Sequence, residues 1–523
     1  MRARGELGRP SGQSTMEQPT KPPNSQKIPH RRDPWIRRYS VELRLAVIVF
    51  FACAYFFTGG SWNSNAHLAT VMSIVDDGTV YIDRYRESTG DIAHAPGGTV
   101  SSKAIGAPLA AIPAYVFAKL ASAHMTQRGN QLIVRAYVTT ALTMGAVMAL
   151  LVLAIYRALR RRLDAQDAAM LALAVVLATP LFPNAAMLSQ HVMTALVAFA
   201  CYSTLEGWRL RRIVHHEGTQ TATCDRPRPS QLVFAGFLGG LAPVFEYPSA
   251  IVLIPLTAYA FWACRLRFRI VWFFAGVGLA LLIPMTYHTL VFGGPFKTAY
   301  SALIRPEFIA IHRQGFLGFD HFSLLRLYEL TFGRSRGLFI LAPFLVAAVP
   351  GLVRMLRNRT TRAEGITVGV IAWSVVLFIA SFVNWHSGSA VGSRFVHIFI
   401  VFSSIPLATI YPHHRGWMRV GIAVSFFLMF IAISVTSVPP PPDANVLQYY
   451  FEHFFSGDIA WWQGEIIKQQ GIGTGSPTYP FAFNLGLVLG LPGIWSLVPF
   501  CIVMSALSIR LWRLDAEHAN RHG

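Results

Sequence analysis

Charged residues are scarce in this chain, and acidic residues are the scarcest kind. Only 25 of the 523 residues are Asp or Glu, and charged residues together make up 13% of the sequence. That is about half the share found in a soluble domain. Hydrophobic residues make up 53%, and the mean hydropathy is +0.43. This composition excludes an ordinary soluble protein and indicates a membrane protein.

Cysteines are also few, and their placement excludes two kinds of site. The chain has five, and most of them lie in apolar runs: Cys53, Cys201, Cys224, Cys264 and Cys501. Their spacing indicates neither a zinc site nor a disulfide framework. The net charge of +20 would suggest nucleic acid if the protein were soluble. Because the basic residues cluster between apolar runs, orientation in the membrane explains them better, and we expect no nucleic-acid partner.

Long apolar runs recur along the whole chain, many near the length that crosses a bilayer. About twelve candidate spans meet that length, at residues 42–61, 131–155, 166–186, 190–207, 231–245, 248–264, 269–291, 337–354, 365–383, 395–411, 418–437 and 483–511. The sequence therefore predicts an all-α polytopic membrane protein. No internal sequence repeat is evident, which argues against an inverted-repeat transporter.

Residues 105–120 form one more apolar segment, which is short and interrupted by Pro108 and Pro113. If it does not cross the membrane, all strongly basic segments fall on one side: 31–38, 157–163, 209–212, 264–269, 354–362, 413–419 and 510–522. If it does cross, the later basic loops turn outward while the N-terminus stays inside. The tendency of basic loops to stay inside predicts that this segment is a juxtamembrane or re-entrant helix. Both termini are then cytoplasmic.

Two domains follow from this organisation. Residues 1–40 are polar and basic, and we expect a disordered cytoplasmic tail. Residues 41–523 form the transmembrane domain, with three long outer loops at 62–130, 292–336 and 438–482. Functional polar residues concentrate in these outer loops and at the outer ends of the spans.

The first outer loop carries a large share of the scarce acids. It contains Asp76, Asp77, Asp83, Glu87 and Asp91, together with His67 and Lys103. Acids that only keep a loop soluble are the plain alternative. However, the apolar segment that follows should press this loop onto the membrane. Lys103 then lies at headgroup height, where it can hold a lipid phosphate, and a nearby carboxylate can act as a general base.

Further candidates lie at the outer ends of spans. Arg135 lies near the outer end of the second span, where a charge is costly unless it is compensated or snorkels to the headgroups. Glu246 interrupts an apolar stretch before Pro248, so it is either functional or paired with a basic side chain such as Arg135. His191 is either a structural hydrogen-bonding residue or part of a site.

Three arginines meet the outer interface beside glycine-rich turns: Arg334, Arg336 and Arg394. Their guanidinium groups suit a phosphate or diphosphate, although headgroup anchoring is the alternative. Trp62, Trp385 and Tyr300 could stack on a sugar, but interfacial aromatic belts explain such residues as well.

The first outer loop resembles the first periplasmic loop of the GT-C glycosyltransferases, the superfamily of protein O-mannosyltransferases and the lipid A aminoarabinose transferase. It is more closely similar to that of a bacterial group of GT-C-like membrane proteins. The matching residues are Asn63, Asn65, Asp76, Gly78, Thr79, Ile82, Asp83, Thr89, Gly90, Asp91, Ala93, Ser101, Lys103, Ala104 and Gly106. Shorter matches follow in the same order at 178–191, 246–250, 292–300, 332–343 and 384–395.

The sequence departs from the family pattern where an acidic pair usually follows the first span. By position, that pair is Asn63–Ser64 here. Another acid of the family pattern is replaced by Ser102, and the Gly-His-Tyr-Tyr element has become Gly97-Gly98-Thr99-Val100. Lys103 is retained.

The resemblance implies a GT-C-like fold, with juxtamembrane helices in the first outer loop, and a glycosyltransferase in the bacterial cytoplasmic (inner) membrane. It would move a hexose or pentose from a polyprenyl-phosphate-linked donor to a lipid, glycan or protein acceptor on the outer side. Asp91 or Asp83 is the preferred base, before Asp76 and Asp77.

The lipid phosphate would be held by Lys103, Arg135, Arg334, Arg336 and Arg394, and Asn63, His67, Glu246 and Trp385 complete the substrate-binding candidates. We expect no metal or other cofactor, and membrane lipids as the further partners. Two alternatives remain: a flippase for lipid-linked glycans, or a GT-C fold that has lost catalysis and only binds.

Overall fold

The computed structural model describes residues 34–59, 61–218, 227–264, 268–439, 444–461 and 482–519. The chain divides into two compact units, Met1–Ser40 and Val41–Gly523. Most of the expected disordered tail, residues 1–33, lies outside the described residues. The second unit contains the membrane helices and the outer loops.

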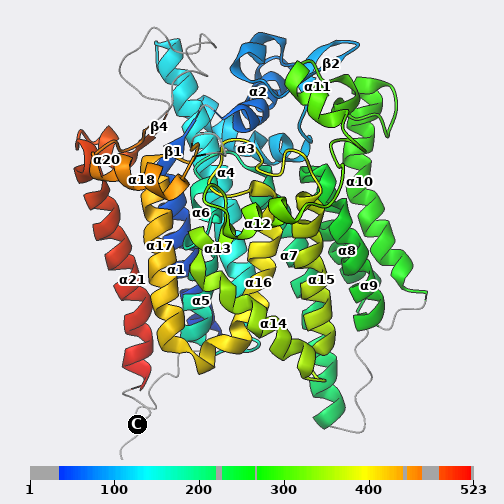
Figure 1. Cartoon of the computed structure of the whole chain (residues 1–523), viewed down its shortest axis with the longest axis vertical. Coiled ribbons are helices and arrows are strands. Elements are labelled where there is room, and N and C mark those ends of the chain that lie inside the picture. The colour runs from blue at the N-terminus through cyan, green and yellow to red at the C-terminus, as the bar shows by residue number, and fades with distance from the viewer. Residues whose placement is uncertain are drawn as a thin grey trace, which may run out of the picture. The chain divides into compact units, whose positions relative to one another are not determined.

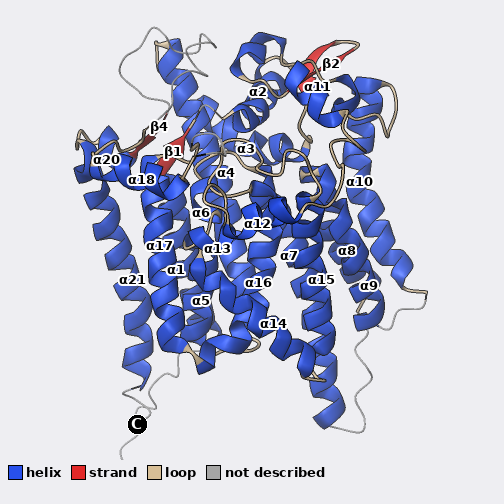
Figure 2. Ribbon diagram, viewed as in Figure 1, coloured by secondary structure: helices blue, strands red, loops and turns tan. Residues whose placement is uncertain are grey.

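The second unit is built almost entirely of helices, with two small strand pairs (Figure 2). Its bundle is formed by α4 (Arg128–Leu159), α5 (Ala165–Leu177), α7 (Gln190–Gly218), α8 (Pro229–Phe245), α9 (Leu253–Cys264), α10 (Ile270–Phe292), α14 (Ala348–Arg357), α15 (Arg362–Ala380), α16 (His397–Ile410), α17 (Arg415–Val435) and α21 (Val498–Ala519). Helix α1 covers Pro34–Tyr55. The prediction of an all-α polytopic membrane protein is confirmed.

Within the described residues, six helical stretches are long and apolar enough to cross a membrane. They are Gly129–Leu159, Ile270–Phe292, Arg362–Ala380, Arg394–His413, Arg415–Val435 and Gly493–Leu511. The count of about twelve spans stays a prediction, because several predicted spans are broken helices.

Proline accounts for two of these breaks. The predicted span at 166–186 separates into α5 and the short α6 (Leu181–Asn184), with Pro180 between them. The span at 337–354 separates into α13 (Leu338–Leu341), η4 (Pro343–Ala347) and α14. Proline has no amide hydrogen and clashes with the preceding turn, so helices end before it.

The first outer loop folds into a small substructure of its own. It contains α2 (Trp62–Asp76), η1 (Asp83–Ser88), the antiparallel strands β2 (Ile92–Ala95) and β3 (Gly98–Ser101), and α3 (Gly106–Ala121). Helix α3 covers the segment expected to be juxtamembrane or re-entrant, and it packs against α2 and α4. The sequence indicated helices in this loop and did not indicate the hairpin.

Strands from opposite ends of the chain pair beside the outer loops. Strand β1 (Phe56–Thr58) continues α1 and pairs antiparallel with β4 (Ala482–Asn484). The hydroxyl of Tyr55 donates a buried hydrogen bond to the carbonyl oxygen of Ser496, at 2.6 Å. These contacts join the first helix to the segment that precedes the last one.

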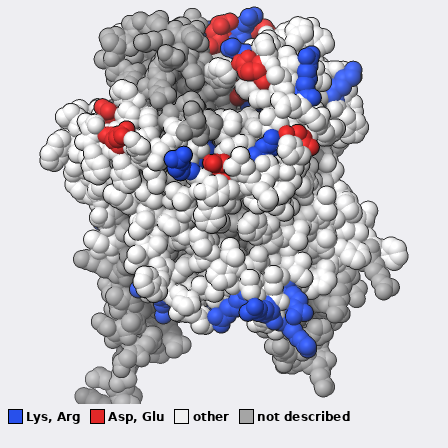
Figure 3. Space-filling view, in the orientation of Figure 1, with Lys and Arg blue, Asp and Glu red and all other residues white. Residues whose placement is uncertain are grey.

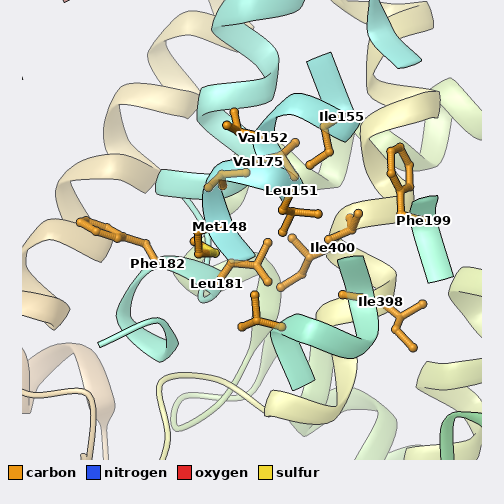
Figure 4. Close-up of a cluster of buried hydrophobic side chains, with 14 of the residues drawn as sticks. Met148, Leu151, Val152, Ile155, Val175, Leu181, Phe182, Phe199, Ile398 and Ile400 are labelled. Atoms are coloured by element: carbon orange, nitrogen blue, oxygen red, sulfur yellow. The ribbon is translucent and has the colours of Figure 1, made fainter. Parts of the chain in front are cut away.

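The inner core of the bundle is apolar (Figure 4). Ten side chains from α4, α5, α6, α7 and α16 meet there, and each is at most 4% exposed: Met148, Leu151, Val152, Ile155, Val175, Leu181, Phe182, Phe199, Ile398 and Ile400. Because lipid tails are as apolar as these side chains, it is their close van der Waals packing that holds the helices together in a membrane. The bundle therefore closes around apolar packing, and polar groups gather at its ends.

One end of the bundle collects arginine ion pairs. The carboxylate of Glu206 on α7 pairs with Arg161 and Arg162, which follow α4. Arg415 at the start of α17 contacts Asp167 on α5, with 2.5 Å between Nη2 and Oδ2. Figure 3 shows a band of Lys and Arg along this lower edge, whereas α2, β2 and α11 (Pro306–His312) lie at the opposite end in Figure 1.

Candidate functional site

A cavity of about 380 Å³ lies among the outer elements. It is lined by segments far apart in the sequence: the start of α2, the end of the β2–β3 hairpin, the start of α7, the break after α8, α11, and the loop before α16. Its polar side chains are Ser61, Asn63, Asp91, Ser102, Lys103, Gln190, His191, Glu246, Tyr300, His312, Asn384, His386, Ser387, Ser389 and Arg394. The cavity thus brings together chemistry-bearing residues from six parts of the chain.

The hairpin places an ion pair on the cavity wall. Lys103 Nζ lies 3.0 Å from Asp91 Oδ1, and the side chains are 23% and 8% exposed. Asp91 directly precedes β2 and Lys103 closely follows β3, whose register sets Ile92 opposite Ser101. The amide of Ser102 also donates to the carbonyl oxygen of Asp91, at 2.9 Å. Pairing of the two strands therefore fixes the lysine beside the carboxylate.

Glu246 forms the second acidic point of the cavity. Helix α8 ends at Phe245, and Glu246 adopts an extended conformation before the 3-10 helix η2 (Tyr247–Val252). Its Oε2 accepts a hydrogen bond from Gln190 Nε2 at 2.9 Å and lies 3.3 Å from His191 Nδ1. Burial raises the pKa of Glu246, partly opposed by the hydrogen bond from Gln190.

Behind this carboxylate lies a fully buried histidine of α2. His67 Nε2 is 2.9 Å from Gln190 Oε1, so Gln190 links α2 to the end of α8. Burial lowers the pKa of His67 to about 4, and the imidazole is therefore neutral at pH 7. His67 itself does not line the cavity.

Arg394 supplies a second cation. Its Nη2 donates to the carbonyl oxygen of Ser387 at 2.6 Å, and its amide donates to Ser387 Oγ at 3.0 Å. Ser387 and Gly388 have φ angles of +57° and +72°, so the loop turns tightly around the guanidinium group. Across the described part of the chain, no carboxylate lies within ion-pair distance of Arg394. Its charge is available to an anion in the cavity.

Arg336 supports the same loop from behind. It is 1% exposed, and its Nη2 donates to the carbonyl oxygen of Gly388 at 3.3 Å. Burial lowers the pKa of Arg336 to about 10. Burial, and then the charge of Arg336, lower the pKa of His386 to about 4.

An aromatic wall faces these charged groups. The ring of Trp62 lies edge-on to Phe308 at 6.1 Å, and the guanidinium of Arg305 lies 5.0 Å from its centre. The rings of Tyr300 and His312 stack at 4.8 Å. Flat apolar rings beside polar groups suit a ligand such as a sugar ring, which has both kinds of surface.

Two acids of the first outer loop, Asp83 and Asp77, lie outside this cavity. They make contacts within the loop itself. Asp83 Oδ1 accepts the amide of Thr99 at 3.0 Å, which ties η1 to β3. Asp77 forms an ion pair with Arg84 at 2.8 Å, and both side chains are partly exposed.

Asp76 and Arg135 form a separate cluster between α2, α3 and α4. The carboxylate of Asp76 accepts hydrogen bonds from Tyr115 at 2.6 Å and Lys119 at 2.7 Å, and lies 3.8 Å from Arg135. Although burial acts to raise the pKa of Asp76, these hydrogen bonds outweigh it and lower the pKa. Arg135 also donates to Ser122 Oγ at 2.9 Å. Arg135 is thus paired with Asp76 and not with Glu246, the partner that the sequence suggested. Glu246 contacts Gln190 and His191 instead.

The remaining candidates also lie outside the cavity lining. Arg334 is exposed, and Trp385 is half-buried beside His386. Sequence reasoning did not select Gln190, His312 or His386. A signal existed for Gln190 and His386, because both lie in segments, 178–191 and 384–395, that match the family pattern.

Metal binding needs several ligands close together. Among the residues that the structure describes, no group of three or more His, Cys, Asp or Glu side chains is arranged to hold a metal ion.

Comparison with known proteins gives structural neighbours. No protein-family model and no curated protein sequence matches the chain. It is similar to ArnT from Cupriavidus metallidurans bound to undecaprenyl phosphate, with 15% identity and a TM-score of 0.46 over 81% of this chain and 69% of that chain. ArnT from the same organism in the apo state gives 14% identity and a TM-score of 0.46, over 82% and 70% of the two chains.

A second neighbour is the oligosaccharyltransferase AglB from Archaeoglobus fulgidus in complex with an inhibitory peptide and a dolichol-phosphate. It shares 11% identity and a TM-score of 0.44, over 86% of this chain but only 60% of that chain. Both neighbours belong to the GT-C superfamily, which the sequence motifs also resemble. TM-scores below 0.5 do not identify the activity of this chain.

Proposed function

We propose that the chain is a GT-C-type membrane glycosyltransferase that takes a sugar from a polyprenyl-phosphate donor. The observation that carries the proposal is the cavity itself. It combines two carboxylates, Asp91 and Glu246, with two cations, Lys103 and Arg394, beside an aromatic wall. Transfer of a sugar from a phosphate needs this combination, because a base must take a proton and cations must hold the departing phosphate.

Lys103 and Arg394 are the proposed phosphate-holding residues. Arg394 has no carboxylate partner within the described residues, and Lys103 has one that a phosphate can displace. The guanidinium of Arg394 offers two donors to a phosphate, while Lys103 acts as a point charge. The lipid donor would carry a hexose or pentose, and direct displacement would invert the anomeric centre.

The proposed location is the bacterial cytoplasmic membrane, with the cavity on the outer side and both termini inside. The arginine ion pairs at the opposite end of the bundle support this orientation, since basic segments stay in the cytoplasm. The acceptor, whether lipid, glycan or protein, would enter from the outer side. A flippase fits less well, because a flippase needs polar groups across the bilayer midplane, and the core of this bundle is apolar.

A GT-C fold that binds without catalysis is the other alternative, because the usual acidic pair is Asn63–Ser64 here. Asn63 lines the cavity, and Ser64 Oγ accepts the amide of Leu188 at 3.1 Å. A serine that holds a neighbouring backbone amide has a structural task. Catalysis therefore depends on the acids that remain in the cavity.

The test is transfer by the purified protein. It is incubated with radiolabelled polyprenyl-phosphate hexoses and pentoses, and with membranes of a strain lacking the gene. We expect polyprenyl phosphate to be released and the sugar to appear on a membrane component with inverted configuration. Binding of undecaprenyl phosphate without any release from the whole panel would support the binding protein instead.

A further inference from the structure

Each of the two carboxylates of the cavity has one oxygen in contact with a neighbouring side chain, and they differ in the charge of that neighbour: the cation Lys103 for Asp91, and the neutral amide of Gln190 for Glu246. Asp91 Oδ1 forms the ion pair with Lys103. Both contacts of Glu246 are made to one oxygen, Oε2. Its other oxygen, Oε1, makes no hydrogen bond within the described residues. Glu246 therefore combines a fixed carboxylate plane with one oxygen that is open to a ligand.

The hydrogen-bond directions around Glu246 are mutually consistent. An ionised carboxylate only accepts, so Gln190 must present its NH₂ group to Glu246 and its carbonyl oxygen to His67. His67 then carries its proton on Nε2, which leaves Nδ1 without a proton. His67 Nδ1 is buried and has no hydrogen-bond partner within the described residues, so no acceptor there calls for a proton on Nδ1, which agrees with this assignment.

The second amide hydrogen of Gln190 fixes the adjacent histidine. Gln190 Nε2 is 3.2 Å from His191 Nε2, which must then accept. Neutral His191 consequently carries its proton on Nδ1, the atom that lies 3.3 Å from Glu246 Oε2. Gln190 thus donates to this carboxylate oxygen, the ring of His191 lies against the same oxygen, and together they hold the group in one orientation.

We propose that Glu246 is the general base of the reaction, that Gln190 and His191 are its positioning residues, and that Asp91 positions Lys103. This assignment rests on the proposed glycosyltransferase function. The acceptor O–H gives its proton to Glu246 Oε1 while its oxygen bonds to the anomeric carbon. The bond from that carbon to the phosphate oxygen breaks, and its electron pair leaves on the phosphate, against Lys103 and Arg394. Glu246 then returns the proton to water.

The charges that face Glu246 suit this role. Lys103 and Arg394 favour its ionised form and Asp91 opposes it, while burial opposes it most and raises the pKa. Among the described residues, the hydroxyls of Tyr247 and Tyr300 and the ring of His191 also face it. A carboxylate with a raised pKa is a stronger base at neutral pH than an ordinary glutamate. Asp91, in contrast to Glu246, already forms an ion pair with the ammonium group of Lys103.

The first experiment compares Glu246→Gln with Asp91→Asn in the transfer assay. General-base catalysis contributes about 100- to 10,000-fold, so Glu246→Gln should lower kcat by at least about 100-fold while undecaprenyl phosphate still binds. Asp91→Asn should mainly raise KM for the donor. Glu246→Asp should recover part of kcat, because it keeps the carboxylate. Retained binding of undecaprenyl phosphate shows that the variants fold.

The second experiment is a pH profile of kcat. Activity should fall as pH drops through the pKa of Glu246. Gln190→Leu removes a hydrogen bond to the ionised carboxylate, so this acidic limb should move to higher pH. Gln448→Leu is the matched control. Gln448 is an exposed residue outside the cavity that donates to Glu452 at 2.8 Å, and its loss should leave the limb in place.

The outcomes separate the two proposals. No release of polyprenyl phosphate by the wild-type protein, from any donor of the panel, overturns the proposed function and the base assignment with it. Release by the wild type and by Glu246→Gln at rates within about threefold, with Asp91→Asn inactive, overturns the assignment alone. A profile that Gln190→Leu does not move overturns the positioning role.

Discussion

At the scale of single residues, the Lys103–Asp91 pair has two separable tasks. It holds the end of the hairpin to the cavity wall, and it keeps a cation ready for the donor phosphate. Because both side chains are largely buried, removing one partner leaves the other charge without compensation. Removing the second partner as well should therefore restore the stability of the protein, because no unpaired charge stays buried. It should not restore phosphate binding, because the cation is still missing.

We predict that Lys103→Met lowers stability by about 1–3 kcal/mol and weakens undecaprenyl phosphate binding by about 10- to 100-fold. Adding Asp91→Asn should restore most of the stability, because no charge is then left buried, but should not restore binding. Melting temperature in detergent and lipid titration measure the two effects. Restored binding in the double variant would show that Lys103 does not hold the phosphate.

His67 gives a second prediction at this scale, on stability against pH. Its pKa is lowered from 6.5 to about 4 by burial, so the folded protein resists a proton that the unfolded chain takes up. The stability due to neutral His67 is complete above pH 6.5 and is lost as the pH falls toward about 4. The loss amounts to about 3 kcal/mol.

Replacement of this histidine should flatten that dependence. In His67→Gln, an amide can still donate to Gln190 but cannot titrate. Thermal unfolding in detergent should therefore lose less stability across this pH range than in the wild type, and His124→Gln, at an exposed position, serves as the control. Identical pH dependence in the wild type and His67→Gln would contradict a buried neutral imidazole.

At the scale of elements, the crossing of α8 and α10 positions Glu246. Small residues recur at every fourth position on both helices, with Gly236 and Gly240 on α8 and Gly276 and Ala280 on α10. A Cβ atom at Gly276 would overlap the carbonyl oxygen of Val233. Small residues let helix backbones approach closely in a membrane, and Glu246 follows directly from the end of α8.

We therefore predict that Gly276→Val destabilises the protein by about 1–3 kcal/mol or more and lowers transfer activity. Gly278→Val is the matched control, since it lies on the same helix and a Cβ atom there meets nothing within 4 Å. Melting temperature and activity are measured for both variants. Equal effects would mean that the close crossing is not what positions Glu246.

The elements also show where sequence patterns stop being informative. Hydropathy located the apolar segments, because a bilayer imposes a minimum length. It could not distinguish a straight span from one broken at Pro180 or Pro343, since both are equally apolar. The β2–β3 hairpin was missed because its four-residue strands carry little periodicity, and the pairing of β1 with β4 joins residues more than 400 positions apart.

At the scale of the whole molecule, the two ends of the bundle differ in charge and predict an orientation. Glu87 is exposed in the outer loop, and Arg359 is exposed between α14 and α15. In a variant whose native cysteines are serine, Glu87→Cys should react with a membrane-impermeant maleimide in intact cells. Arg359→Cys should react only after permeabilisation. The reverse pattern would invert the proposed topology.

The cavity as a whole was only partly predictable. Asp91, Lys103, Glu246, Arg394 and Asn63 were selected because charge or a motif marked them, and the fold places them in one lining. Asp76, Asp83 and Arg135 are charged as well, but their partners lie within their own loop or on neighbouring helices. Which acid faces the cavity depends on side-chain partners, and no local pattern encodes these. Gln190 was missed because candidates were chosen by their charge or titratable chemistry, and an amide side chain has neither.

The central claim is that this cavity releases a sugar from a polyprenyl-phosphate donor. The most direct measurement is the rate of polyprenyl phosphate release by purified wild type, Lys103→Met and Lys297→Met, where Lys297 is an exposed outer lysine that does not line the cavity. We predict release by the wild type and the Lys297 variant, and a rate at least about 10-fold lower for Lys103→Met. Equal release by all three proteins, or none by the wild type, would contradict the account.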